Sequence, residues 1–208
     1  MYTTLALDLD GTLTTSTKEI TVRTKEAVQR AHDKGVHIVL ASGRPVLGIV
    51  PVARRLGLLG EDATILAYNG GQLVSTRNLE VIWERTVDLN TIHTCFTYAK
   101  EHRLAALSYD EQGVITEMPD DPYVGLEAYN NAIPIRKVDD LIAEVRHPMP
   151  KVMIVGEPAR LLAAKEALTG LVGDHADLGF SDPFFMEITA QGVQKASSLT
   201  TLLALLGH

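Results

Sequence analysis

The stretch LALDLDGTLT, residues 5–14, sets the interpretation of the whole chain. It begins as an apolar run of leucine and alanine, which is typical of a buried strand, and continues into Asp8, Asp10 and Gly11. Two carboxylates this close repel each other, so they are stable only if they share a proton or bind a cation. The sequence therefore predicts a strand that ends in a candidate chemical site.

Two more apolar segments follow the first, with helical patterns between them. Strands are predicted over residues 4–9, 36–41 and 64–68, and helices over residues 22–34 and 45–56, with Thr21 capping the first helix. This βαβαβ order predicts a parallel sheet with right-handed crossovers. Pro51 lies inside the second helix and is expected to kink or split it.

From residue 72 onward hairpins and helices mix, which is typical of an α+β module. A hairpin is predicted over residues 72–75 and 81–85. Further helices are predicted over residues 89–102, 138–146, 158–168 and 192–206, and further strands over residues 105–109, 113–117, 151–155 and 184–188. The expected fold class is α/β: a Rossmann-like parallel sheet core, residues 1–71 and 190–208, with an α+β module, residues 72–189, inserted after the third parallel strand.

The three predicted parallel strands all end in polar residues and glycines. These are Asp8, Asp10 and Gly11 after the first strand, Ser42, Gly43 and Arg44 after the second, and Asn69 and Gly70 after the third. Ligands bind outside the carboxyl ends of parallel strands, so we expect these residues to share one site. Their glycines let the backbone approach a ligand closely.

The residue types at these strand ends suit phosphate chemistry. Mg²⁺ prefers one or two carboxylates together with phosphate oxygens and water, which fits Asp8 and Asp10. A carboxylate can also attack phosphorus once the negative charges are screened. Ser42 and Asn69 can donate hydrogen bonds to phosphoryl oxygens, and a lysine can neutralise the charge that develops.

Simpler interpretations of the same residues stay open at this point. Two aspartates after a strand are common turn formers, and Asn69-Gly70 is a common hairpin dipeptide. An EF-hand loop would use Asp8, Asp10 and Glu19, but Leu13 stands where that loop needs glycine. The segment before Asp8 also predicts a strand, whereas an EF-hand needs a helix there.

Four segments together resemble a known family: DLDGTLT (residues 8–14), ASGRP (41–45), YNGG (68–71) and MEITAQGVQKASSL (186–199). They are similar to the haloacid dehalogenase-like hydrolase superfamily, and more closely to Cof-type phosphatases, which carry a large α+β cap between the second and third motifs. The resemblance implies that Asp8 is a nucleophile that becomes an aspartyl phosphate. It also implies that Asp10 protonates the leaving alcohol and later activates water.

The resemblance gives the remaining site residues roles as well. Ser42 would bind the phosphoryl group, Gly43 and Arg44 would shape that loop, and Asn69 would line the substrate pocket. Lys195 matches the lysine of the third motif, although it could instead be a solvated helix residue. The implied activity is Mg²⁺-dependent hydrolysis of small phosphorylated metabolites similar to sugar phosphates. An inactive remnant that binds a phosphorylated ligand or partner, and a phosphomutase, are the alternatives.

The family's fourth motif, a strand leading to Gly-Asp and a second aspartate, has no match after Lys195. The segment GDHAD, residues 173–177, has the wrong position and spacing and is interpreted as a cap loop. We therefore expect a chain truncated before that motif, or one that self-associates through the exposed edge of its first strand. Loss of the remaining carboxylates is expected to weaken metal binding and catalysis.

Composition excludes several other classes of function. The 208 residues carry a net charge of -7, which gives no general attraction to nucleic acid or to anionic membranes. No apolar run reaches the roughly 20 residues of a membrane span. The single cysteine, Cys95, and the absence of a secretory leader favour the cytoplasm.

The cap is expected to select the substrate, but its sequence does not identify one. Its polar candidates are Asp110, Glu111, Tyr123 and Arg136, each of which is more typical of a solvated surface. Its histidines show no metal-binding spacing.

Overall fold

The computed structural model describes residues 2–15 and 17–207. They form two compact units, one made of Met1–Glu84 and Gln194–His208 and the other of Arg85–Val193. This division differs from the expected one, which ended the first segment at residue 71. Residues 72–84 belong to the first unit because their two strands hydrogen-bond within its sheet. The expected α/β class is confirmed.

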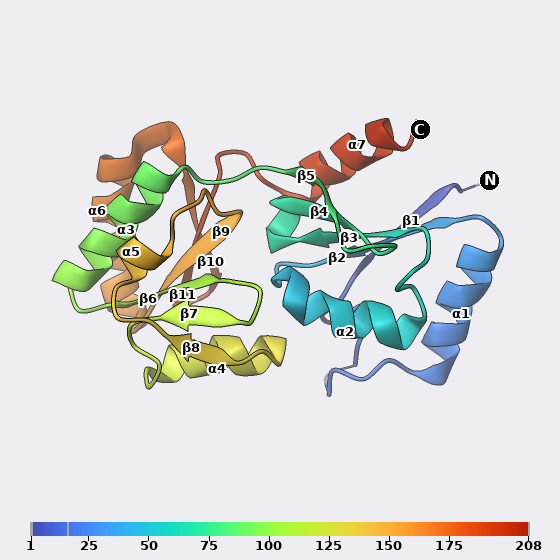
Figure 1. Ribbon diagram of the computed structural model, residues 1–208, viewed down its shortest axis with the longest axis horizontal. Coiled ribbons are helices and arrows are strands. Elements are labelled where there is room, and N and C mark those ends of the chain that lie inside the picture. The colour runs from blue at the N-terminus through green and yellow to red at the C-terminus, as the bar shows by residue number, and fades with distance from the viewer. Residues whose placement is uncertain (1, 16, 208) are drawn as a thin grey trace. The chain divides into compact units, whose positions relative to one another are not determined.

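The first unit is built around a five-stranded sheet in the order β1-β2-β3-β4-β5. Its strands are β1 (Thr4–Asp8), β2 (His37–Ala41), β3 (Ala63–Ala67), β4 (Gln72–Ser75) and β5 (Val81–Glu84). The first three strands are parallel, and the last two are antiparallel additions. Helices α1 (Val22–Asp33) and α2 (Val46–Leu56) cover one face of the sheet, and α7 (Lys195–Leu205) covers the other (Figure 1).

The burial of these strands follows from their place in the sheet. β3 is buried along its whole length, and β2 is buried from its second residue on, because helices cover both faces. Val39, Leu66 and Leu202 form the core beneath α7. β1 lies at the edge with β2 as its neighbour, and its Leu5 remains 37% exposed.

Two local expectations in the first unit have different outcomes. Thr21 caps α1 as predicted, since its side chain accepts a hydrogen bond from the backbone N–H of Thr24 at 3.1 Å. Of the two effects expected of Pro51, a split of the second helix is wrong, because α2 runs through Pro51 as one element. Pro51 is exposed, so water can hydrogen-bond the carbonyl that loses its helical partner.

The second unit contains a six-stranded sheet in the order β10-β11-β9-β6-β7-β8. Its strands are β6 (Ala105–Tyr109), β7 (Val114–Thr116), β8 (Ile135–Lys137), β9 (Lys151–Val155), β10 (Asp177–Asp182) and β11 (Phe185–Thr189). Its helices are α3 (Leu89–Glu101), α4 (Pro122–Asn131), α5 (Leu141–Glu144) and α6 (Pro158–Val172). The expected loop at 173–177 is instead a short 3₁₀ turn, Gly173–His175, followed by the first residue of β10.

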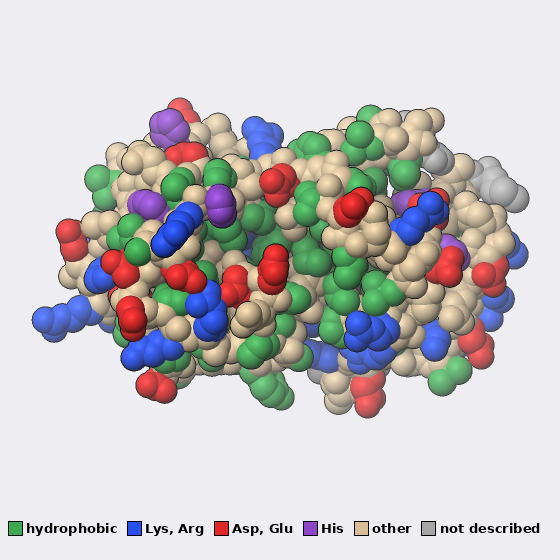
Figure 2. All heavy atoms as spheres, viewed as in Figure 1, with side chains coloured by type: hydrophobic (Ala, Val, Ile, Leu, Met, Phe, Trp, Pro, Cys, Tyr) green, Lys and Arg blue, Asp and Glu red, His purple; other side chains and the backbone are tan. Residues whose placement is uncertain are grey.

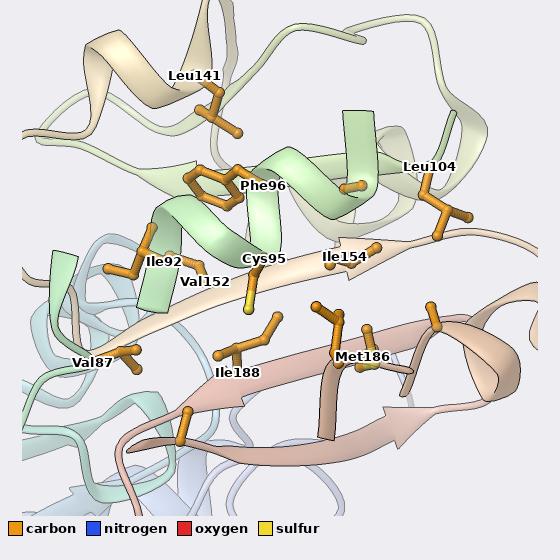
Figure 3. Close-up of a cluster of buried hydrophobic side chains, with 14 of the residues drawn as sticks. Val87, Ile92, Cys95, Phe96, Leu104, Leu141, Val152, Ile154, Met186 and Ile188 are labelled. Carbon is orange, nitrogen blue, oxygen red and sulfur yellow. The ribbon is translucent and has the colours of Figure 1, made fainter. Parts of the chain in front are cut away.

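The core of the second unit lies between its sheet and the helices α3 and α6. Figure 3 shows Cys95 pointing from α3 toward Ile188 on the sheet, with Val152 and Ile154 nearby. Burial, helped by the charge of Asp88, raises the pKa of the Cys95 thiol to about 12. The thiol is therefore protonated at neutral pH and acts as a core side chain.

The surface carries charges of both signs. In the view of Figure 2, acidic and basic side chains are interspersed, without a continuous basic patch. Within the described residues, the longest apolar helices fall short of what a membrane crossing requires.

Candidate active site

The turn after β1 presents two carboxylates and buries the residue between them. The side chains of Asp8 and Asp10 are 42% and 52% exposed, whereas Leu9 is fully buried and anchors the turn in the core. Thr14 closes the turn by donating hydrogen bonds from its backbone N–H and its hydroxyl to the Leu9 carbonyl, at 2.9 and 3.0 Å. Gly11 adopts φ +77°, which a residue with a side chain rarely does.

Lys195 reaches Asp8 although 187 positions separate them in the sequence. Its Nζ lies 2.5 Å from Oδ1 of Asp8. Lys195 is the first residue of α7, whose N-terminus is fixed by reciprocal hydrogen bonds between Gln194 and Ser197. Asp8 is therefore held by a cation at the start of a helix, where the lysine and the helix dipole both favour a negative charge.

Gly70 positions the start of α7. Its φ is +106°, and a Cβ added there would lie 2.6 Å from Oγ of Ser198 and 2.8 Å from the carbonyl oxygen of Gln194. The Ser198 hydroxyl donates a 2.7 Å hydrogen bond to the Gly70 carbonyl. The loop after β3 thus holds the helix that carries Lys195, and this role of Ser198 was not predicted from the sequence.

Arg44 forms two hydrogen bonds to the carboxylate of Asp10 through its guanidinium group. Its Nε donates to Oδ2 of Asp10 at 2.9 Å, and its Nη2 donates to Oδ1. The Arg44 side chain is only 14% exposed, whereas the Asp10 side chain is 52% exposed. The largely buried arginine therefore orients the exposed carboxylate. The backbone N–H of Arg44 also donates to Oγ of the buried Ser42 at 3.2 Å.

Hydrogen bonds join the loops that follow β2 and β3. The N–H of Asn69 donates to the Ser42 carbonyl, and the N–H of Tyr68 donates to the Arg44 carbonyl, both at 3.0 Å. A Cβ at Gly43 would lie 2.9 Å from Oδ1 of Asn69, so glycine is what allows this close approach. Together with the Arg44–Asp10 hydrogen bonds, these contacts link the ends of β1, β2 and β3. The sequence predicted that the three strand ends lie close together, but it did not specify these contacts.

The donor set at β1 fits a magnesium ion. Asp8 and Asp10 supply two accessible carboxylates, and Mg²⁺ takes its remaining ligands readily from phosphate and water. In the described part of the chain no group of three or more His, Cys, Asp or Glu side chains could hold a metal. An EF-hand is excluded because the strand β1 precedes Asp8.

Three of the four polar candidates of the second unit pair with side chains of that unit. Arg136 forms ion pairs with Asp110 and with Glu144. Burial alone would raise the pKa of Asp110, but hydrogen bonds from Arg136 and from two backbone N–H groups hold it below its usual range. Glu111 is exposed, and Tyr123 donates a 2.8 Å hydrogen bond to Glu157.

Comparison with known proteins identifies the family. The model of the haloacid dehalogenase-like hydrolases matches residues 5–208. The chain belongs to that family. A haloacid dehalogenase-like hydrolase from Bacteroides thetaiotaomicron has the same fold, with a TM-score of 0.95 and 36% identity over 100% of this chain and 78% of its own.

Two proteins with phosphatase in their names are also similar to this chain. YxeH of Bacillus subtilis, which carries the name of a phosphatase, is 29% identical over 100% of this chain and 77% of its own length. The HAD subclass IIB sugar phosphatase BT4131 shares the fold at 19% identity, with a TM-score of 0.79 over 99% of this chain and 76% of its own.

Proposed function

We propose that this chain is a phosphoric monoester hydrolase that acts on small phosphorylated metabolites through an aspartyl phosphate at Asp8. The observation that carries the proposal is the convergence of Asp8, Asp10, Lys195 and Arg44 at the end of β1. Family membership and relatives with phosphatase names support it. The names of a sugar phosphatase and of an HMP-PP phosphatase from Enterobacter favour a small phosphorylated substrate.

In the first step, an oxygen of Asp8 attacks phosphorus and the bond to the leaving alcohol breaks. Lys195 neutralises charge on Asp8 and on the incoming phosphate. The Ser42 oxygen accepts a hydrogen bond from the Arg44 N–H, which orients the hydroxyl group. The hydroxyl then donates its own hydrogen bond to a phosphoryl oxygen. Asp10 enters this step protonated on one oxygen, while its other oxygen still accepts a hydrogen bond from Arg44, and it transfers that proton to the alcohol as the alcohol leaves.

In the second step, water attacks the phosphorus of the aspartyl phosphate. Asp10 is now ionised and removes a proton from that water, while the Asp8–phosphorus bond breaks. The products are inorganic phosphate and the original carboxylate of Asp8, and Asp10 is again protonated. One residue thus serves first as an acid and then as a base.

Magnesium removal tests the proposed cofactor. Bound Mg²⁺ would supply charge neutralisation that the two cationic side chains do not provide alone. With p-nitrophenyl phosphate as substrate, we expect excess EDTA to lower the rate about a hundredfold or more, and added Mg²⁺ to restore it. An unchanged rate after EDTA treatment would argue against the metal but leave the role of Asp8 to be tested separately.

Gly70→Ala tests whether the loop after β3 positions Lys195. The added methyl group collides with Ser198 and with the Gln194 carbonyl, which displaces the start of α7. We expect kcat for p-nitrophenyl phosphate to fall about tenfold to a hundredfold, since small misplacements of a catalytic group are costly.

Gly60→Ala is the matched control for that variant. Gly60 has φ +86°, and a Cβ there meets no atom within 4 Å. Both variants carry the strain of a left-handed backbone, but only the Gly70 variant moves α7. Equal losses of activity in the two proteins would show that α7 placement is not the cause.

The edge of the first sheet supports a proposal about association. β1 offers one unpaired backbone edge with the exposed side chains of Leu5 and Ala6, which favours pairing with a second copy of the chain. Light scattering should then show dimers that increase with protein concentration, and Ala6→Pro should reduce them. A monomer at every concentration would contradict the pairing.

Cysteine usage and net charge bear on the cellular setting of the protein. We propose a cytoplasmic location, which the single free and buried Cys95 supports. We also propose that neither nucleic acid nor a membrane is a partner, since the net charge is -7.

A further inference from the structure

The second unit contains a cavity of about 340 Å³ beside α3. Its apolar lining comes from Phe96, Leu104, Ala106 and Leu141, and Figure 3 shows the Phe96 and Leu141 side chains facing one another. None of the strand-end residues described above contributes to it. This volume lies within the range of small-molecule sites and is too small for a folded partner.

The charged side chains of the cavity leave one cation uncompensated. Lys100 and Glu117 pair at 3.3 Å, and the Glu117 carboxylate also accepts a 2.9 Å hydrogen bond from the Leu141 N–H. Arg103 completes the charged lining, and no acidic partner for it is found among residues 2–15 and 17–207. The cavity therefore combines an apolar interior with a net charge of one positive unit.

The backbone places Arg103 in an unusual position. It follows the last turn of α3 with φ +52°, and the N–H groups of Arg103 and Leu104 donate to the carbonyls of Lys100 and Ala99. This is the Schellman arrangement, in which glycine is the usual residue at the left-handed position. An arginine there has the unfavourable backbone conformation of a left-handed residue, and its exposed side chain lines the cavity.

We propose that this cavity binds a small amphipathic monoanion, with an apolar body inside and a carboxylate on Arg103. A guanidinium matches a carboxylate in two parallel hydrogen bonds, and the apolar lining provides the driving force for the body of the ligand. Because Arg103 is the one uncompensated cation among the described residues of the cavity, the cavity favours a ligand with one negative charge over a ligand with two. This site is independent of the proposed hydrolysis.

Three probes of equal shape and different charge test the proposal by calorimetry. They are 2-naphthylacetate, the neutral 2-(2-naphthyl)ethanol and the cationic 2-(2-naphthyl)ethylamine. We expect the acid to bind about tenfold more tightly than the alcohol, and the amine to bind most weakly. Amide chemical shifts should change along α3 and at residues 104–106 and 117–118. Equal affinity for acid and alcohol, no saturable binding, or shifts elsewhere would overturn the proposal.

Variants separate the charge of Arg103 from its effect on folding. Arg103→Met and Arg103→Gly should both weaken binding of 2-naphthylacetate about tenfold. The glycine variant should melt at or above the parent temperature, because glycine is the favoured residue there. Arg77→Met, at an exposed turn in the first unit, should change neither property.

Glu117→Gln should have the opposite effect. Glutamine can still accept the hydrogen bond from the Leu141 N–H, but it no longer neutralises Lys100. Binding of 2-naphthylacetate should therefore tighten several-fold, while binding of the alcohol should stay the same. Unchanged affinity in the Arg103 variants, or equal changes for both probes in the Glu117 variant, would contradict an anion site.

Discussion

Asp8→Asn is expected to lower kcat for p-nitrophenyl phosphate by about 10⁴-fold or more, because the amide cannot form the phosphoenzyme. Asparagine has nearly the same shape as aspartate, so the turn after β1 should be preserved. Its loss of charge also removes the ion pair with Lys195, whose Nζ lies 2.5 Å from Asp8 in the structure. Initial-rate kinetics with excess Mg²⁺ provide the measurement.

The control for this variant is Asp62→Asn, an exposed aspartate in the same unit. Both proteins should melt at close to the parent temperature, since surface ion pairs contribute little to stability. Only the Asp8 variant should lose activity. Retention of more than about a tenth of the parent rate by Asp8→Asn would be incompatible with covalent catalysis at this position.

Asp10→Asn should have the second-largest effect, and the effect should depend on the leaving group. A poor leaving group such as the alkoxide of glycerol phosphate needs a proton from Asp10, whereas p-nitrophenolate leaves without one. We expect a loss of about 10²- to 10⁴-fold with glycerol phosphate. With p-nitrophenyl phosphate the first step should survive, and hydrolysis of the phosphoenzyme should become rate-limiting.

This difference is visible in a rapid-mixing experiment. Asp10→Asn should release a burst of p-nitrophenolate equal to the enzyme concentration, followed by a slow phase. The parent protein serves as the control, with a smaller burst or none. Equal losses with both substrates and no burst would mean that Asp10 does not act as an acid and base, and that the Arg44 pair has only a structural role.

The parallel half of the fold could be predicted because its signals are local. β2 and β3 are continuous apolar runs, and the turn after β1 is marked by Asp8, Asp10 and Gly11. The predicted strands and helices there end within two residues of the observed ones. β10 was missed although Leu178 and Phe180 alternate with exposed residues, because these are its only two large apolar side chains and the strand lies at the edge of the second sheet.

The closeness of the candidate residues was predictable, but their individual contacts were not. The family resemblance implied that Lys195 lies at the strand ends, and the structure pairs it with Asp8. The Arg44–Asp10 pair depends on the exact direction of two side chains from different loops, which no sequence period encodes. The contact between Ser198 and Gly70 was not predictable either, because it depends on the close approach that glycine permits at position 70.

We expect phosphorus to become bonded to Asp8 during turnover. Acid quenching during turnover of a phosphate monoester, followed by borohydride reduction and peptide mass spectrometry, tests it directly. We expect conversion of Asp8 to homoserine in the peptide that spans β1, in Asp10→Asn more than in the parent protein. Active enzyme with unmodified Asp8 under these conditions, or with the label on another residue, would contradict it.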